Sequence, residues 1–116
     1  MPATDATPFD LTGHHILFVG GRRHHAAHFR QLVEACNGEF THHDGGMEDN
    51  MRRLPGLFNQ ADAVLFPVSC VSHAAQDEVK RQCRRHEIPY MPLRSSGVGA
   101  FVQALEVYCG RCARPQ

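Results

Sequence analysis

Residues 16–19 read Ile-Leu-Phe-Val and residues 63–66 read Ala-Val-Leu-Phe, two unbroken apolar runs with the length of β-strands. Neither run alternates with polar residues, which is the pattern of a strand buried on both faces. Strands of this kind occur in parallel sheets, because the connecting helices cover both sides of the sheet. We therefore expect these two runs to be the central strands of a parallel sheet.

Short strand-like segments alternate with longer helix-like segments along the rest of the chain. Strands are predicted at 16–19, 39–42, 63–67 and 90–93, and helices at 26–36, 48–60, 72–86 and 99–109. Each crossover between parallel strands contains a helix, so this alternation indicates a parallel sheet. The sequence predicts an α/β fold: a small doubly wound, flavodoxin- or Rossmann-like, four-stranded parallel sheet of order 2-1-3-4, with helices on both faces.

The length of 116 residues suits one domain. We expect a flexible leader at 1–13, a single α/β domain at 14–108 and a C-terminal tail at 109–116. No apolar run approaches the roughly 20 residues of a membrane span, and the first residues lack the features of a signal peptide. The expectation is a cytoplasmic protein that does not bind membranes.

The charge composition argues against a nucleic-acid-binding protein. Twelve Lys and Arg balance twelve Asp and Glu, and the chain has no Trp and only two Tyr for base stacking. Nine histidines make the charge positive as the pH falls. Any charged ligand must therefore be recognised by a local cluster of side chains rather than by the net charge.

The loops after the predicted strands contain the residues whose side chains are best suited to binding or catalysis. They read Gly-Gly-Arg-Arg-His-His at 20–25, His-His-Asp-Gly-Gly at 42–46, Ser-Cys-Val-Ser-His at 69–73 and Arg-Ser-Ser-Gly at 94–97. Loops that leave the carboxyl ends of parallel strands meet at one edge of the sheet, where ligands bind. The sequence thus predicts a functional site at this edge.

An anion site is the first hypothesis for these loops. Backbone amides at Gly20 and Gly21, near the start of a helix, and the side chain of Arg22 are suited to bind an anion, and Arg94 and Ser95 extend the set. The two glycines are equally well explained as a tight turn, and Ser95 as a helix N-cap. No dinucleotide-binding or P-loop motif is present.

A metal site is the second hypothesis. Cys70 and His73 are three residues apart near a predicted helix start, a spacing at which a thiolate and an imidazole can bind one zinc ion, with His43 as a third ligand. A helix N-terminus also lowers the pKa of a thiol. The alternative is a small apolar role for Cys70 and a solvated imidazole for His73.

The remaining cysteines suggest redox or secondary roles. Cys83 is either a core residue, which we favour, or a group that pairs with its counterpart in a dimer. Cys109 and Cys112 form a CxxC pair after the last predicted helix, either half of a zinc site or an unstructured reactive tail. With five cysteines in a reducing compartment, thiols are expected rather than disulfides.

Taken together, the motifs resemble a bacterial family known as domain of unknown function 2325. The similar segments read ILFVGGRR, HHDGG, LPGLFNQADAVLFPVSCVSH, VKRQC and PYMPLRSSG, over about residues 15–105. The polar positions that correspond to the family are Gly20, Gly21, His43, Asp44, Gly45, Gly46, Cys70, Ser72, His73, Cys83, Arg94 and Ser95. The resemblance implies a small doubly wound domain, often self-associating, with metal-binding and redox-responsive character. Ser69 stands where the family often has Asp, which removes one potential ligand.

Three functions are compatible with these observations. The first is a cytoplasmic metal-binding, thiol-responsive sensor or accessory protein, most simply a homodimer, in which oxidation of Cys70 would release a divalent metal such as zinc. The alternative is an enzyme or binding domain for a small anionic, phosphorylated ligand at the carboxyl edge of the sheet. The third is an interaction module that binds another protein.

Overall fold

The computed structural model describes residues 10–21, 23–44, 51–95 and 97–113, with the exception of the side chains of 51, 70 and 110–113. The elements in chain order are β1 (His15–Val19), α1 (Arg23–Ala35), β2 (Glu39–His43), η2 (Met51–Arg53), α2 (Leu54–Phe58), β3 (Ala63–Pro67), η3 (Val68–Cys70), α3 (His73–His86), β4 (Tyr90–Leu93) and α4 (Val98–Ala113). Here η marks a short 3-10 turn.

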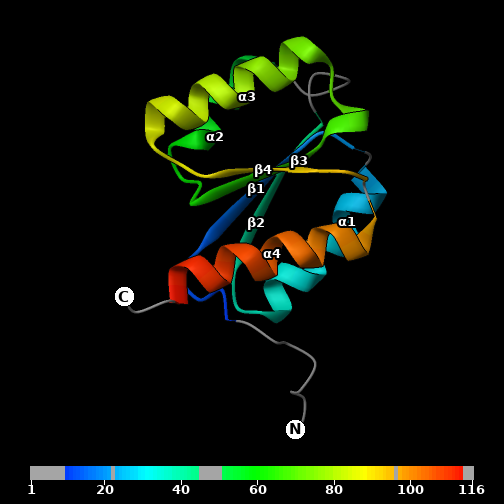
Figure 1. Ribbon diagram of the computed structural model, residues 1–116, viewed down its shortest axis with the longest axis vertical. Helices are drawn as coiled ribbons and strands as arrows, with labels where there is room; N and C mark the ends of the chain where they lie inside the picture. The colour runs from blue at the N-terminus through cyan, green and yellow to red at the C-terminus, as the bar shows by residue number, and fades with distance from the viewer. Residues whose placement is uncertain (1–9, 22, 45–50, 96, 114–116) are drawn as a thin grey trace, which may run out of the picture.

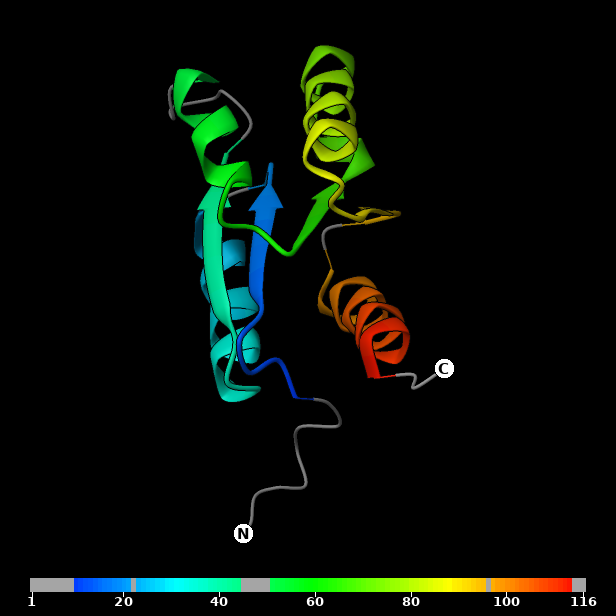
Figure 2. The ribbon, with the colours of Figure 1, turned by 90° about the vertical axis from the view of Figure 1, so that its left-hand side faces the viewer.

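The strands form one four-stranded parallel sheet of order β2-β1-β3-β4, so the predicted fold class is confirmed. The two apolar runs are the central strands β1 and β3, which pair in register at Ile16 with Ala63 and Phe18 with Leu65. Figure 2 shows the strong twist of the sheet, in which β4 runs nearly crosswise to β2. The architecture is flavodoxin-like.

Each face of the sheet is covered by helices, α2 and α3 on one face and α1 and α4 on the other (Figure 1). Alternate residues of β1 supply the two clusters: Phe18 packs with α1 and α4, and Leu17 packs with α2 and α3. Phe29 of α1 stacks on Phe101 of α4 with ring centroids 4.2 Å apart. Burial of each such side chain contributes roughly 1.5 to 3 kcal/mol to the stability of the fold.

The ends of α3 are determined by local hydrogen bonds. The hydroxyl of Ser72 accepts a hydrogen bond from the amide of Ala75 at 3.1 Å, which is an N-cap. At the other end Glu87 adopts a left-handed conformation with φ of 58°, and its amide donates to the carbonyl of Arg84 at 3.3 Å. These bonds satisfy groups that a helix terminus would otherwise leave unpaired.

Both ends of the domain differ from the expectation. Leu11, within the expected leader, is completely buried, and its amide donates to the carbonyl of Cys36 at 2.7 Å. Gly38 makes room for it, because a Cβ at Gly38 would lie 2.7 Å from the Cβ of Leu11. At the other end the backbone of α4 continues to Ala113 through the expected tail. Residues 10–13 and 109–113 therefore belong to the folded unit.

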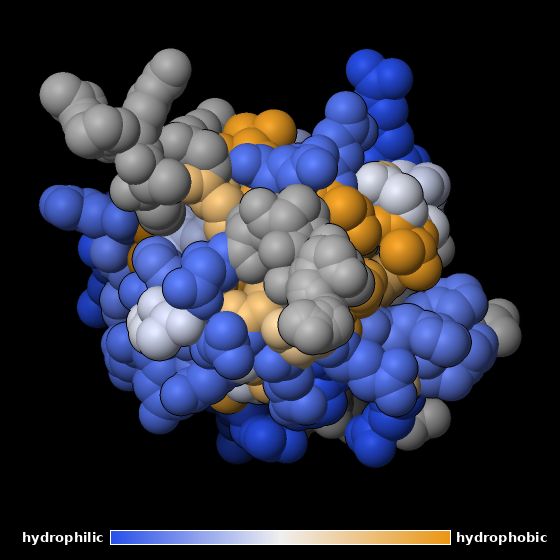
Figure 3. Space-filling view, turned by 90° about the horizontal axis from the view of Figure 1, so that it is seen from below, coloured by the Kyte–Doolittle hydropathy of each residue, from blue (hydrophilic) through white to orange (hydrophobic). Residues whose placement is uncertain are grey.

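Helix α1 also begins earlier than the sequence predicts, at Arg23 rather than at 26. Its first residues are Arg and His, which continue the helix without adding to its apolar face, so periodicity did not detect them. Viewed from below, the surface is mostly hydrophilic, with hydrophobic residues gathered in a few places (Figure 3). Within the described residues, no helix is both long and apolar enough to cross a bilayer.

Candidate functional site

The loop between β1 and α1 is tied to the end of β2 by two hydrogen bonds around Gly20. The amide of Gly20 donates to the carbonyl of His43 at 2.7 Å, and Nε2 of His42 donates to the carbonyl of Gly20 at 2.9 Å. Gly20 and Gly21 have φ of 99° and 77°, in the left-handed region that favours glycine. The amide of Gly20 is thus used within the protein, in contrast to its predicted contact with a ligand, and the loop is held in place instead.

The first turn of α1 carries basic side chains at a position where physical chemistry favours acidic ones. Arg23, His24 and His25 occupy this turn, which has no acidic residue. The helix dipole puts partial positive charge at a helix N-terminus, so a cation there destabilises the helix by roughly 0.3 to 1 kcal/mol. A bound anion would offset this unfavourable arrangement. Such a local conflict is typical of a functional position.

A pocket of about 320 Å³ opens beside this turn of α1. It is lined by Arg23, Ala26, Ala27, Arg30, His42 and Arg53, which come from α1, β2 and η2. Three guanidinium groups and one imidazole therefore surround a common space, and none of these lining residues has a carboxylate. The two alanines leave room for a ligand between the basic groups.

Two of the basic groups are held in place by contacts with neighbouring residues. Arg30 donates from Nη1 to the carbonyl of Phe40 at 3.2 Å, and its guanidinium carbon lies 5.3 Å from the centroid of the Phe40 ring. The ring of His42 packs against the ring of Phe18, with centroids 6.0 Å apart. Side chains that are already ordered lose less conformational entropy when they bind a ligand.

The hydrogen bond of His42 determines where its proton lies. A carbonyl oxygen only accepts, so Nε2 carries the hydrogen that it donates to Gly20. Nδ1 is then the ring nitrogen left for a ligand. It accepts a hydrogen bond when the imidazole is neutral and donates one when the imidazole is protonated.

The geometry suits a tetrahedral oxyanion. Guanidinium groups form paired hydrogen bonds with two oxygens of a phosphate, and several such groups around one space neutralise a dianion. Among the described lining residues the polar groups are all basic. The arrangement can therefore bind a phosphoryl group.

The other predicted anion-binding residues lie elsewhere. Arg94 and Ser95 follow β4, the edge strand opposite β2, which is three strand spacings away, or about 14 Å. The hydroxyl of Ser95 accepts a hydrogen bond from the amide of Gly97 at 3.2 Å. Arg22 lies outside the described residues. The structure therefore does not bring Arg94 and Ser95 together with the basic pocket at α1.

The predicted metal ligands lie at the end of β2, at the end of η3 and at the start of α3. His43 is buried at the end of β2, on the face covered by α2 and α3, and His73 is the exposed first residue of α3. The side chain of Cys70 lies outside the part of the chain that the structure describes. Among the described side chains, no group of three or more His, Cys, Asp or Glu is placed to hold a metal ion. The metal site stays a prediction.

The cysteines occupy different environments. Cys83 lies in the core between α2, α3 and the sheet, and burial raises the pKa of its thiol to about 12. Burial also raises the pKa of Cys36. Cys109 is half-buried in α4, and the side chain of Cys112 lies outside the described residues. A thiol with a high pKa is a poor nucleophile and a poor redox group at neutral pH, which favours the core role for Cys83.

The candidate residues named from the sequence did not include Arg30, Arg53 or His42. Arg30 lies seven residues after Arg23, which is two helical turns, so the two share one flank of α1, and an arginine search at that spacing would have paired them. Arg53 lies eleven residues after His42 in sequence. Only the folded chain brings it to the pocket, and no local pattern predicts this.

None of the curated proteins and none of the solved structures compared with the chain matched it. One family model matches residues 15–108, which include the whole sheet and most of α4, and it is described as an uncharacterized protein conserved in bacteria (DUF2325). This match covers most of the chain and agrees with the resemblance of its motifs. The chain therefore belongs to the bacterial family DUF2325.

Proposed function

We propose that this protein is a binding domain for a small phosphorylated ligand, whose phosphoryl group occupies the basic pocket beside α1. The observation that carries the proposal is the set of Arg23, Arg30, Arg53 and His42 around one space. Guanidinium and imidazole groups that line a common space attract an anion and can donate several hydrogen bonds to its oxygens.

The local structure supports this proposal in two further ways. The basic side chains in the first turn of α1 interact unfavourably with the helix dipole, and a bound anion offsets this interaction. The side chain of His42, which lines the pocket, is already held by its hydrogen bond to Gly20, so it loses less conformational entropy when a ligand binds. Both features stabilise the bound state more than the free state.

The experiment is calorimetric titration with inorganic phosphate, pyrophosphate and a nucleoside monophosphate. Arg53→Gln should weaken binding about tenfold, because it removes a charge-assisted hydrogen bond. Arg52→Gln is the matched control: it removes the same charge at the preceding residue, which does not line the pocket, and it should change the affinity less than about twofold. Equal losses in both variants, or no binding of any of the three anions, would contradict the proposal.

The metal-binding, thiol-responsive function remains a separate proposal. What supports it is the spacing of Cys70 and His73 at the start of α3, together with a buried imidazole at His43. Elemental analysis of untagged protein tests it against Cys70→Ala and His73→Ala. Loss of bound zinc in both variants would support the site, and equal metal content in all three proteins would eliminate it.

A further inference from the structure

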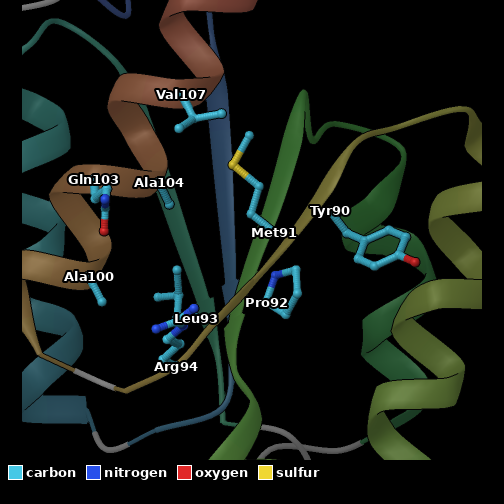
Figure 4. Close-up of a pocket in the computed structure, with 9 residues that line it drawn as sticks. All are labelled: Tyr90, Met91, Pro92, Leu93, Arg94, Ala100, Gln103, Ala104 and Val107. Atoms are coloured by element: carbon cyan, nitrogen blue, oxygen red, sulfur yellow. The ribbon is translucent and has the colours of Figure 1, made fainter.

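A second hollow lies between the edge strand β4 and α4, on the opposite edge of the sheet from the basic pocket. It has a volume of about 370 Å³, in the range of small-molecule sites. It is lined by Tyr90, Met91, Pro92, Leu93, Arg94, Ala100, Gln103, Ala104 and Val107 (Figure 4). We call this hollow the β4–α4 groove.

The groove has an apolar floor and one charged end. Met91 and Leu93 extend from β4 toward α4, and Ala100 and Ala104 face them from the helix (Figure 4). The two alanines are too small to fill the space between strand and helix, which leaves the hollow. Among the described lining residues Arg94 is the charged one, and its side chain makes no hydrogen bond or ion pair with another described residue.

The edge of β4 is unsuited to an added strand. Backbone groups of alternate residues point outward from an edge strand, and because Pro89 accepts from Val64 of β3, the outward groups belong to Tyr90 and Pro92. Pro92 has no N–H to donate, and proline on an edge strand prevents pairing with a further strand. A peptide in extended conformation is therefore a poor occupant of the groove.

A second copy of the chain is also a poor occupant. Stable interfaces bury about 800 Å² per partner around an apolar centre. Among the described residues, the exposed large hydrophobic side chains near the groove are Tyr90 and Val107, at 37% and 49% exposure. Two such residues supply too little apolar area for a stable dimer. A small ligand needs only the groove itself.

We propose that the β4–α4 groove binds a small amphipathic carboxylate, an anion with a short aliphatic or aromatic body. Its apolar part lies on Met91, Leu93 and Ala104, and its carboxylate pairs with Arg94. Gln103 adds a neutral hydrogen-bonding group on the helix side. This site is separate from the basic pocket, so each can be tested without the other.

The test is an NMR titration of ¹⁵N-labelled protein with hexanoate, and with 1-hexanol as the uncharged counterpart. Hexanoate should shift the amide signals of Tyr90, Met91, Leu93 and Arg94 and of residues 100–107. Arg94→Gln should weaken the binding of hexanoate about fivefold or more and leave the affinity for hexanol unchanged, because only the carboxylate pairs with the guanidinium. Ala104→Phe should prevent the binding of both compounds by filling the groove. Arg84→Gln, which removes an exposed charge on α3, should leave the affinity for both compounds unchanged.

Four outcomes would overturn the proposal. One is the absence of hexanoate shifts in these residues, and another is equal weakening by Arg94→Gln and Arg84→Gln. A third is hexanol binding that matches hexanoate in affinity and is equally sensitive to Arg94→Gln. The last is a dimer in solution that Ala104→Phe converts to monomer, which would assign the groove to a second copy. Because Arg94 is exposed, Arg94→Gln tests the proposal even where Ala104→Phe fails to fold.

Discussion

Among single residues, His42 has the most consequential environment. Its bond to Gly20 places the proton on Nε2 and leaves Nδ1 for a ligand in the basic pocket. The neutral ring offers a lone pair at Nδ1, which an anion avoids, whereas the protonated ring offers a hydrogen and a positive charge. The protonated ring therefore suits an anion in this pocket better than the neutral ring does.

A role for His42 in binding predicts that His42→Asn weakens sulfate binding about fivefold, because asparagine retains a donor for the carbonyl of Gly20 but has no ring nitrogen left for the anion. Calorimetry measures the affinity. His28→Asn, on the opposite flank of α1, should leave the affinity unchanged; the reverse result would contradict the role of His42.

The buried thiol of Cys83 leads us to expect that the free energy of unfolding falls at alkaline pH. Burial raises the pKa of this thiol to about 12 in the folded protein, whereas an exposed thiol titrates near 8.5. Between these values the unfolded chain releases a proton that the folded chain keeps, so the free energy of unfolding falls as the pH rises from about 9 toward 12. Urea unfolding at about pH 8 and pH 10 should show a smaller fall for Cys83→Ala than for the unchanged protein.

Thiol reactivity provides the control for this prediction. A thiol-specific reagent at about pH 8 should leave Cys83 unmodified in the folded protein and should modify it after denaturation. Rapid modification of Cys83 in the folded state would show that the thiol is accessible and would contradict the expected alkaline effect.

Residue types in the loops indicated where basic side chains are found, but not which of them lie together. Gly20 and Gly21 identify the loop that ends beside the basic pocket. Arg94 is equally basic in the sequence, yet it lies at the opposite edge of the sheet, because strand order and not chain order determines which loops are neighbours. Loop composition alone therefore could not separate Arg94 from the basic residues near α1.

Among the elements, α3 has the most clearly defined ends, and they support a stability prediction. Glu87 adopts a left-handed conformation, which costs a residue with a Cβ roughly 1 kcal/mol compared with glycine. Glu87→Gly should therefore raise the free energy of unfolding by about 0.5 to 1 kcal/mol, as measured by chemical denaturation.

Asn37 is the matched control for Glu87. It also has a positive φ, of 71°, at the end of α1, but asparagine tolerates this conformation better than glutamate. Asn37→Gly should stabilise the protein less than Glu87→Gly does. A larger gain at Asn37 would show that backbone strain is not the dominant effect at Glu87.

The existence and order of the elements were predictable because apolar patterns reflect burial. The run at 63–66 lies entirely within β3 and is completely buried. Helix ends were less predictable: the helix expected at 48–60 is described as a 3-10 turn at Met51–Arg53 followed by the short α2 at Leu54–Phe58, with 48–50 outside the described residues. Pro55, in the first turn of α2, suits that start.

For the whole molecule, the segment before β1 contributes to stability. Leu11 is fully buried in the cluster under α1 and α4, and Gly38 provides the space for it. Leu11→Ala should lower the free energy of unfolding by about 2 to 5 kcal/mol, which urea denaturation measures. Thr12→Ala, at an exposed neighbouring position, should cost less than about 1 kcal/mol. Similar small effects at both positions would mean that the segment is not part of the core.

The packing of this segment was not predictable from its composition. Polar and small residues around Leu11 resemble a loose leader, and the family match begins only at residue 15. The contact depends on Gly38, which is distant in sequence and lacks a side chain. Pairings of this kind are decided by the shape of the folded chain rather than by local pattern.

The position of β1 in the middle of the sheet has a consequence for synthesis of the chain. Ile16 pairs with Ala63, which is 47 positions later, so at ordinary ribosomal speeds β1 waits about 2 to 10 s for its second neighbour. During this interval Leu17 and Val19 are not fully covered, because α2 is made only toward its end and α3 is made after it. The emerging β1–α1–β2 unit therefore has an uncovered apolar face for seconds. At this stage the nascent protein is most vulnerable to aggregation and to binding by chaperones.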